Sequence, residues 1–273
     1  SSGLKLDDTV VSRLAALDHV ACVIPKINEY NSYTLYAGTD GRYICSDLMI
    51  VGEHFQDARA EGLELSEGSW ETLKKEDVLV GQYLAYALID SKRPEGHNYI
   101  NRYEYYNWEE NSYSADLPDP YVDLKKDKLI LTIGQESMDN DNDRSLSVEL
   151  HVGGVLKEDW NRGFETSEGI YMDLDVWKEL LDQYARLTGG KSLSEKGYSS
   201  IMVKADDISH VESVEKEIKR MGFGTSSMES IRKPMEQDVQ QKQMLLGCVG
   251  AVSLFVAALG IRREHQDSLC LKS

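Results

Sequence analysis

One stretch of the chain is apolar without interruption, and it lies near the C-terminal end. Residues 244–261 read MLLGCVGAVSLFVAALGI, with no charged residue and no proline. A bilayer-spanning helix takes roughly 20 apolar residues, and here the apolar residues surround the helix instead of forming one stripe. Arg262 and Arg263 follow, and basic residues favour the cytoplasmic side. The pattern predicts a transmembrane helix over 244–261 and a cytoplasmic tail fragment over 262–273. A buried helix of a soluble protein is the alternative.

A polar segment comes directly before this apolar run. Pro234 suits the first turn of a helix, and the residues that follow it up to the apolar run are polar, reading MEQDVQQKQ. A helix that continues through both segments would hold the preceding domain ~15 Å above the bilayer, at ~1.5 Å per residue. We therefore predict a stalk over 234–243 that transmits motion between the domain and the membrane.

The rest of the chain mixes helical and strand periodicities. Near the N-terminus, Val10, Leu14 and Leu17 fall on one helical face behind Asp7 and Asp8, which predicts a capped helix over 9–17. Strand patterns follow at 20–24, which Pro25 ends, at 33–36, 43–45 and 48–51, at 78–81, at 129–133, 145–152 and 170–172, and at 198–204 and 223–227. Further helices are predicted over 82–90, over 174–187, and from Asp206-Asp207 to Gly222 with an apolar face of Ile208, Val211, Val214, Ile218 and Met221.

These elements predict an α+β fold with two lobes. The helix–strand pattern at the N-terminus is echoed by a strand–helix–strand pattern near the other end, so we expect both ends to build one membrane-proximal βαβ-type lobe from 1–52 and 195–233. Residues 53–194 would form an inserted, strand-rich lobe. Within it, 92–121 is rich in Tyr, Asn, Asp and Pro with little periodicity, and we expect an insertion or a long hairpin there.

Charge narrows the range of partners. The chain has 30 Lys and Arg against 47 Asp and Glu, a formal net charge of −17. Nucleic-acid binding needs a basic footprint, and docking on an anionic membrane surface also needs basic residues, so both are disfavoured. The chain opens with Ser1-Ser2-Gly3 and no signal peptide, which suggests an excised fragment or a processed product. Cys22 and Cys45 lie in two strand patterns, where they could pair or remain two free thiols.

Patterns that carry catalysis or cofactors are weak. The six histidines are scattered, with no HExxH motif, no Gly-x-Ser-x-Gly elbow and no phosphate-binding G-x-x-x-x-G-K-[ST]. We therefore expect a protein that is not an enzyme, with no catalytic residue, no cofactor and no metal. The run of Asp139, Asp141 and Asp143 imitates a calcium loop, but Arg144 stands where that loop needs glycine. A solvated turn or a weak calcium site are the two interpretations.

A loop of aromatic and acidic residues is the strongest candidate for recognition. Tyr103, Tyr105, Tyr106, Trp108 and Tyr113 are interspersed with the carboxylates of Glu104, Glu109, Glu110 and Asp116. Aromatic faces attract cations, and loops on a scaffold often carry recognition. The loop could contact a cationic peptide, a glycan or a partner protein, or it could be a decoration without a binding role.

Four stretches carry a family resemblance. They are LDDTVVSRLAALDHVACVIPKI, MIVGEHFQDARAEGLELSEGSWETLKKEDVLVGQYLAYAL, GYSSIMVKADDISHVESVEKEIKRMGFGTSS and MLLGCVGAVSLFVAALGI. In order and spacing they resemble the extracellular, periplasmic-core-like domain of MacB/FtsX-type ABC transporter permeases. The sequence departs from that family after Gly260-Ile261, where Arg-Arg-Glu-His-Gln follows, and the Tyr-rich segment 92–121 has no counterpart in it.

The resemblance implies a function without catalysis. Such a domain would lie outside the cell or in the periplasm, held at the cell membrane by 244–261. A cytoplasmic ABC ATPase subunit and a second permease copy or homologue would be its partners, and ATP-driven motion would serve the export or handling of peptides, lipoproteins or drugs, or a cell-wall partner protein. A membrane-tethered binding or adhesion module using loop 98–121 and an anchored hydrolase are the other hypotheses.

Overall fold

The structure, a computed structural model, describes residues 5–29, 33–46, 48–134 and 144–226. Contacts between residues divide the chain into two compact units, one of Lys5–Lys204 and one of Ser1–Leu4 with Ala205–Ser273. The predicted stalk 234–243, the transmembrane helix 244–261 and the tail 262–273 lie outside the described residues. Within the described part, no helix combines the length and apolar character that crossing a membrane requires.

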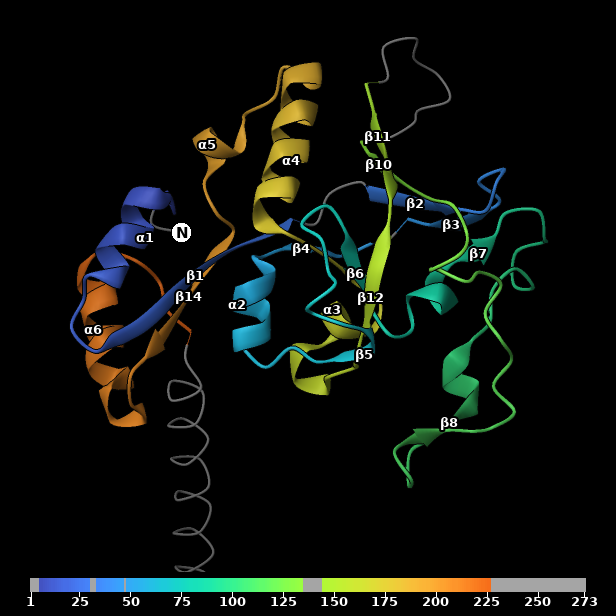
Figure 1. The fold of residues 1–273 in the computed structure, drawn as a ribbon, viewed down its shortest axis with the longest axis horizontal. Coiled ribbons are helices and arrows are strands. Elements are labelled where there is room, and N and C mark those ends of the chain that lie inside the picture. The colour runs from blue at the N-terminus through green and yellow to red at the C-terminus, as the bar shows by residue number, and fades with distance from the viewer. Residues whose placement is uncertain (1–4, 30–32, 47, 135–143, 227–273) are drawn as a thin grey trace, which may run out of the picture. The chain divides into compact units, whose positions relative to one another are not determined.

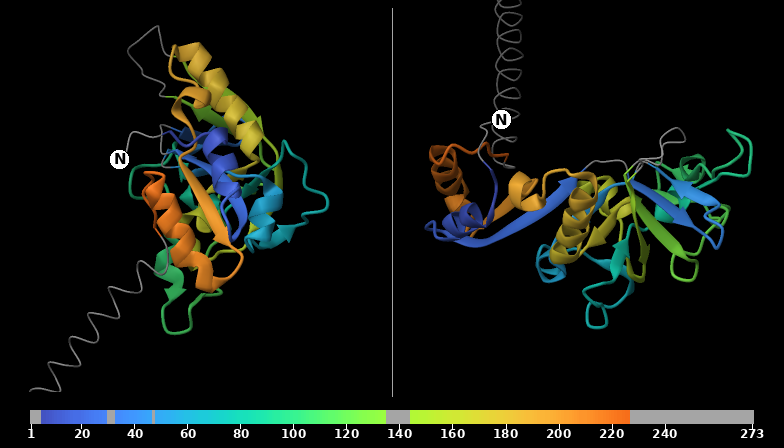
Figure 2. Two further views of the ribbon diagram at one scale, coloured as in Figure 1. Left: turned by 90° about the vertical axis from the view of Figure 1, so that its left-hand side faces the viewer. Right: turned by 90° about the horizontal axis from the view of Figure 1, so that it is seen from above.

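The larger sheet of the Lys5–Lys204 unit has seven strands in the order β14-β1-β4-β13-β6-β12-β5 (Figure 1). In chain order these are β1 (Val20–Glu29), β4 (Ile50–Gly52), β5 (Leu65–Gly68), β6 (Val78–Val80), β12 (Val152–Leu156), β13 (Ile170–Met172) and β14 (Ser200–Ala205). The pairs β4–β13 and β6–β12 are parallel, whereas β1–β4, β6–β13 and β5–β12 are antiparallel. In the right-hand view of Figure 2, the long β1 strand runs beside β14.

A second sheet has five antiparallel strands in the order β11-β10-β2-β3-β7. They are β2 (Tyr33–Ala37), β3 (Tyr43–Cys45), β7 (Ile89–Asp90), β10 (Leu129–Ile133) and β11 (Leu146–Leu150). A separate hairpin pairs β8 (Tyr106–Asn107) with β9 (Ser112–Tyr113). A mixed seven-stranded sheet covered by helices, together with an antiparallel five-stranded sheet, makes this an α+β fold, as the sequence predicts.

The Lys5–Lys204 unit also contains the helices α1 (Asp8–Ala15), α2 (Phe55–Ala60), α3 (Phe164–Ser167), α4 (Leu174–Thr188) and α5 (Leu193–Lys196). Its 3₁₀ turns are η1 (Leu84–Ala87), η2 (Arg102–Tyr105) and η3 (Trp160–Arg162). Asp7 caps α1 by accepting hydrogen bonds from the backbone of Thr9 and Val10, the acidic cap that the sequence predicts. In the view of Figure 1, α4 lies above β4 and α2 lies below it.

The central strands β4, β6 and β13 of the larger sheet are buried on both faces. Successive residues of a strand point to opposite faces, and in β4 Ile50 belongs to one hydrophobic cluster while Val51 belongs to another. Trp177 of α4 is fully buried in the first cluster, and Ala58 of α2 is fully buried in the second. The two helices therefore cover opposite faces of the sheet, and strands buried on both sides read as continuous apolar runs.

Four of the predicted elements need correction, namely 82–90, 145–152, 223–227 and the strand at 20–24. The predicted helix over 82–90 is the 3₁₀ turn η1 followed by strand β7, because Ile89 and Asp90 pair with β3 and the chain must therefore be extended there. The predicted strand 145–152 is broken at His151 into β11 and β12, which belong to different sheets. Residues 223–226 are described and irregular, so the predicted strand at 223–227 is wrong in its described part.

Pro25 does not end β1, although the sequence predicts that it does. The strand runs on to Glu29, and its pairing with β4 begins at Ile27. The proline nitrogen, which has no hydrogen to donate, therefore falls outside that ladder, where a strand tolerates it.

The Ala205–Ser273 unit is described up to residue 226 and contains η4 (Ile208–His210) and α6 (Val211–Arg220). Asp207 caps the first turn by accepting from the Ser209 N–H, as the sequence predicts. Val214 of the predicted apolar face is buried, but Ile208 is 85% exposed, because it lies in the 3₁₀ turn ahead of the α-helix and off its apolar stripe.

The predicted division into 1–52 with 195–233 and 53–194 stays a prediction. Strands from both predicted lobes share the seven-stranded sheet, since β4 pairs with β13. Cys22 is half-buried and Cys45 is buried, and the two do not form a disulfide with each other.

Candidate functional site

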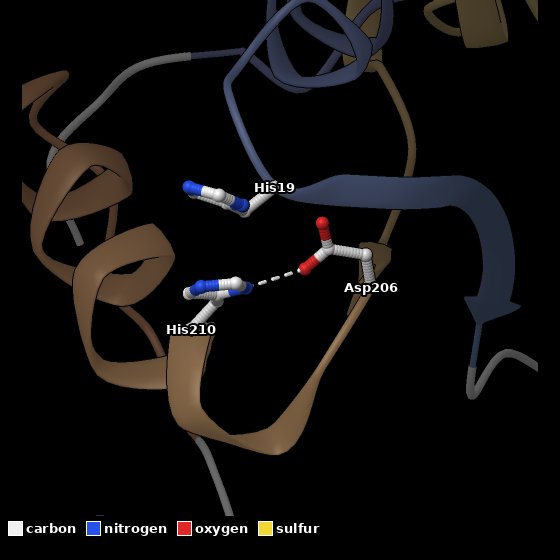
Figure 3. Close-up of side chains that lie close together, drawn as sticks. All are labelled: His19, Asp206 and His210. Carbon is white, nitrogen blue, oxygen red and sulfur yellow. Dashed lines mark hydrogen bonds and ion pairs between the residues drawn. The ribbon is translucent and has the colours of Figure 1, made fainter.

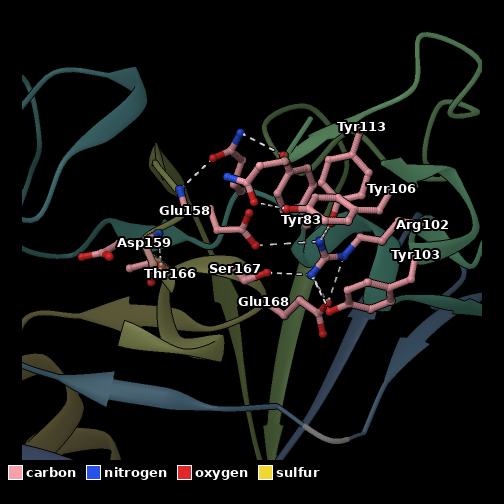
Figure 4. Close-up of polar contacts among 12 residues, drawn as sticks. Tyr83, Arg102, Tyr103, Tyr106, Tyr113, Glu158, Asp159, Thr166, Ser167 and Glu168 are labelled. Atoms are coloured by element: carbon pink, nitrogen blue, oxygen red, sulfur yellow. Dashed lines mark hydrogen bonds and ion pairs between the residues drawn. The ribbon is translucent and has the colours of Figure 1, made fainter. Parts of the chain in front are cut away.

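A buried arginine organises the Tyr-rich segment. Arg102 lies in η2 and is 2% exposed. Its Nη2 donates to Glu168 Oε1 at 2.8 Å and to Ser167 Oγ at 2.8 Å, and its Nε lies 3.2 Å from the same Glu168 oxygen. Glu158 Oε1 is 3.8 Å from Nη1 (Figure 4). A buried charge is tolerated only when it is paired and hydrogen-bonded, and these partners meet that need.

Tyrosine rings surround the same guanidinium. Its central carbon lies 4.5 Å from the ring centroid of Tyr83, 4.4 Å from that of Tyr103 and 5.5 Å from that of Tyr113. The hydroxyls of Tyr103 and Tyr113 also contact Arg102. Burial raises the pKa of Tyr83 and of Tyr103, so both phenols stay protonated and neutral. The cluster is a cation held among aromatic faces.

The aromatic contacts continue outward to the surface. The Tyr106 ring lies 4.9 Å from that of Tyr113, 4.7 Å from that of Trp108 and 6.0 Å from that of Trp160. Tyr106 is almost buried, whereas Trp108 is 73% and Trp160 is 52% exposed. Two tryptophans therefore flank one tyrosine, and both present most of their surface to solvent. We call Tyr106, Trp108 and Trp160 the tryptophan face.

The hairpin that carries Trp108 has a defined turn. Tyr106 pairs with Tyr113 in register, and Asn107 Oδ1 accepts hydrogen bonds from the N–H groups of Glu109 and Glu110. Asn111 has φ of 51°, a left-handed conformation that asparagine tolerates better than most residues. The turn points both glutamates into solvent beside Trp108, since both are exposed.

The structure brings four of the five predicted contact residues together. Tyr103, Tyr106, Trp108 and Tyr113 join the cluster, while Tyr105 is half-buried and accepts a backbone hydrogen bond from Ser114. Sequence reasoning missed Arg102, Tyr83, Trp160, Ser167 and Glu168. Only Arg102 had a visible signal, because it is the one basic residue in 98–121. The calcium candidates Asp139, Asp141 and Asp143 lie outside the described residues.

A groove of about 430 Å³ opens beside the cluster. Ile89, Tyr99 and Tyr103, which are 39%, 49% and 40% exposed, all line it. Arg102 and Glu168 also line it, together with Cys45 and Tyr86. The groove shares Arg102, Tyr103 and Glu168 with the cluster, and it offers a further contact area of mixed polarity.

One group of metal-type ligands occurs within the described Lys5–Lys204 unit. His54, Asp173 and Asp175 place ligand atoms within 4.8 Å of one another. Lys75 Nζ already lies 2.5 Å from Asp175 Oδ2 and 3.6 Å from Asp173 Oδ1, and Asp173 caps α4. The Lys75 ammonium therefore forms ion pairs with both carboxylates. These ion pairs and the cap of α4 explain why His54, Asp173 and Asp175 lie together.

A histidine–carboxylate pair lies at the start of η4 in the Ala205–Ser273 unit. His210 Nδ1 is 2.7 Å from Asp206 Oδ1 (Figure 3). The two residues are four positions apart and both are exposed by more than a third in their side chains. This spacing is that of an ordinary surface pair at a helix start.

Comparison with known proteins finds structural likenesses only. No family model matches the chain, and no curated protein matches it. The chain is similar to the extracellular domain of the noncanonic ABC-type transporter YknZ from Gram-positive bacteria, at 16% identity over 80% of this chain and 82% of that one, with a TM-score of 0.44.

Two further solved structures are similar to it. The periplasmic region of MacB from Actinobacillus actinomycetemcomitans matches at 15% identity over 86% of this chain and 85% of that one, with a TM-score of 0.46. A domain of a protein described as a permease, from Porphyromonas gingivalis, matches at 12% over 85% and 76%, with a TM-score of 0.41. The three neighbours are thus an extracellular domain, a periplasmic region and a domain of a permease.

Proposed function

We propose that this chain is the non-catalytic extracellular domain of an ABC transporter permease of the MacB/FtsX type. The observation that carries the proposal is the order of the four resembling stretches, in which a strand–helix pattern leads into a polar helix pattern and then into the apolar run 244–261. The α+β fold built from the first of these stretches is consistent with it.

In this proposal the domain moves and does not catalyse. A cytoplasmic ABC ATPase subunit hydrolyses ATP, and the stalk 234–243 passes the motion from the membrane to the domain. A second permease copy or homologue completes the assembly. The cargo is a peptide, a lipoprotein or a drug, or the motion acts on a partner protein of the cell envelope.

The chemistry of the described residues supports a role without catalysis. Arg102 is saturated by carboxylate, hydroxyl and ring partners, and the carboxylates beside His54 are bound by Lys75. Burial raises the pKa of Tyr83 and Tyr103, the opposite of what a tyrosine base needs. These groups stabilise structure where they stand.

Association with an ATPase tests the proposal. The chain is expressed together with candidate ABC ATPase subunits from the same genome and is purified from membranes through an affinity tag. We expect the ATPase subunit to co-purify at an equal stoichiometry. Purification of the chain without any ATPase, from a cell that makes both, would contradict the proposal.

A binding or adhesion module is the second candidate. The exposure of Trp108 and Trp160 favours it, because large exposed aromatic side chains often mark interaction sites. The two candidates differ in membrane topology. A permease has several transmembrane spans, whereas a tethered binding module has a single anchor.

A further inference from the structure

We infer that the tryptophan face binds a basic segment, rich in Arg or Lys, of a partner protein. The inference rests on the binding role proposed for loop 98–121 and names the chemistry of what is bound. It depends on three features of the described residues: the exposure of Trp108 and Trp160, the packing beneath them, and the negative charge around them.

The face is supported from beneath. Tyr106 packs against Tyr113, Tyr113 lies 4.9 Å from Tyr83, and both Tyr83 and Tyr113 pack on the Arg102 guanidinium. Arg102 is anchored in turn to Glu168 and Ser167, residues more than 60 positions away along the chain. Tyr106, which both tryptophans contact, therefore stands on a hydrogen-bonded base, and this support lowers the conformational entropy lost when a ligand binds.

The charge around the face is negative. Segment 98–121 contains five carboxylates, those of Glu104, Glu109, Glu110, Asp116 and Asp119, against one basic residue, Arg102. Arg102 is buried and already paired. Within the described part of the chain, Glu109 and Glu110 form no ion pair, and both are exposed next to Trp108.

Basic residues beside Trp160 are also engaged. Arg162 Nη1 lies 3.3 Å from Glu61 Oε2, and Lys157 Nζ lies 2.6 Å from Glu64 Oε2. Asp159, directly before Trp160, remains 42% exposed in its side chain although Arg162 approaches it at 3.6 Å. Both Arg162 and Lys157 are therefore already paired with carboxylates and do not compete for the Trp160 ring.

Both the tryptophan rings and the flanking carboxylates favour a cationic ligand. The faces of aromatic rings carry negative potential and attract Arg and Lys, with Trp the most favourable ring, and the flanking carboxylates add long-range attraction. An anionic lipid surface would be repelled by the same carboxylates. A neutral glycan could stack on the rings but would gain nothing from Glu109 and Glu110, so a basic peptide segment fits best.

Peptide titration tests the inference on the full chain in detergent or nanodiscs. The probe is an end-capped nonapeptide with three Arg separated by Gly and Ala, and its partners carry Gln or Glu in place of Arg. Trp fluorescence or calorimetry gives Kd. We expect the Arg peptide to bind, and W108A to weaken it about fivefold, the loss of one exposed ring–cation contact. E109Q with E110Q should weaken it most at low salt, because exposed charges are screened as salt rises.

A matched control separates this face from the general acidity of the chain. E76Q with E179Q removes the same charge from two exposed carboxylates outside the aromatic cluster, and we expect less than a twofold change in Kd. Equal weakening by the two double variants, or no effect of W108A, would overturn the inference. Trp108 is 73% exposed, so W108A should fold, and circular dichroism verifies this.

The inference and the binding role fail in different ways. If the Gln peptide or a neutral oligosaccharide binds as tightly as the Arg peptide and W108A weakens it equally, the face binds ligands but does not select a cation, and only the inference is overturned. If W108A and W160A change the binding of no probe, the binding role of the loop is lost as well. Neither result bears on co-purification of the ATPase.

Discussion

At the scale of single residues, the most unusual arrangement is a buried group of two glutamates and one lysine. Lys26 Nζ lies 3.0 Å from Glu53 Oε2 and 2.8 Å from Glu61 Oε2, and the whole of Glu53 is buried. Arg162 approaches Glu61 at 3.3 Å. Burial raises the pKa of Glu53 from 4.5 to about 7; Lys26 opposes this rise and the neighbouring Glu61 reinforces it.

This pKa predicts a specific pH dependence of stability. Because the pKa of Glu53 is higher in the folded than in the unfolded chain, its favourable contribution is present below pH 4.5 and is lost as pH rises through 7. The shift corresponds to about 3 kcal/mol. In urea unfolding, the free energy of unfolding of the unaltered chain should fall between pH 5 and 8.5. The free energy of unfolding of E53Q should fall much less over the same range.

The comparison also needs a control glutamate. E76Q replaces an exposed carboxylate and should leave the pH profile of the free energy of unfolding unchanged. Parallel profiles for the unaltered chain and E53Q would show that Glu53 is ionised throughout this range, against the expectation.

Arg102 gives a second prediction at this scale. R102A leaves Glu168 and Ser167 without their buried partner and removes the cation from among three tyrosine rings, and breaking a buried pair costs about 3–5 kcal/mol. R93A is the control, because Arg93 also lies over a tyrosine ring but is 50% exposed in its side chain, and it should cost less than about 1 kcal/mol. Chemical denaturation measures both, and a similar cost for the two variants would argue against the structural role of Arg102.

At the scale of elements, the contact of α4 with β4 depends on a missing side chain. A Cβ at Gly52 would lie 2.5 Å from Trp177 Cδ1, and Trp177 is fully buried with its ring 5.3 Å from that of Tyr33. The tryptophan can therefore lie directly on the strand backbone only because residue 52 is glycine.

Substitution of Gly52 tests this packing. G52A forces Trp177 away from the strand, and overpacking of this kind costs about 1–3 kcal/mol. At Gly224, no atom lies within 4 Å of a Cβ added there, so G224A should be close to neutral. Thermal unfolding compares the two variants, and an unchanged Tm for G52A would mean that the helix does not pack as closely as described.

Elements with regular amphipathic periodicity could be predicted from sequence, because burial of one face dictates the spacing. Helix α4 is an example, with Leu174, Trp177, Leu181 and Ala185 buried. Elements whose position depends on tertiary contacts could not be predicted from sequence. The chain leaves one sheet for another at His151, whose carbonyl accepts from Val78 and whose ring contacts Asp77, and no local pattern records those partners.

The candidate site shows the same division. The Tyr-rich loop stands out in the sequence by composition, and four of its five named aromatic residues do assemble. The base of the cluster could not be predicted, because Arg102 is satisfied by Ser167 and Glu168 and stacks on Tyr83. Trp160 reaches Tyr106 across more than 50 residues of sequence, a separation that periodicity cannot bridge.

At the scale of the whole molecule, the proposed function requires the described domain to lie outside the membrane that the predicted helix 244–261 would span. The chain has four native cysteines, so a variant with alanine at all four provides a background without thiols. E179C then places a single thiol on the exposed surface of α4, and S273C places one in the tail that the sequence predicts to be cytoplasmic.

Labelling of intact cells with a membrane-impermeant maleimide is the most direct measurement of this claim. With the proposed topology, E179C is labelled in intact cells and S273C is labelled only after lysis. Labelling of E179C only after lysis, with the chain present in the membrane fraction, would contradict it.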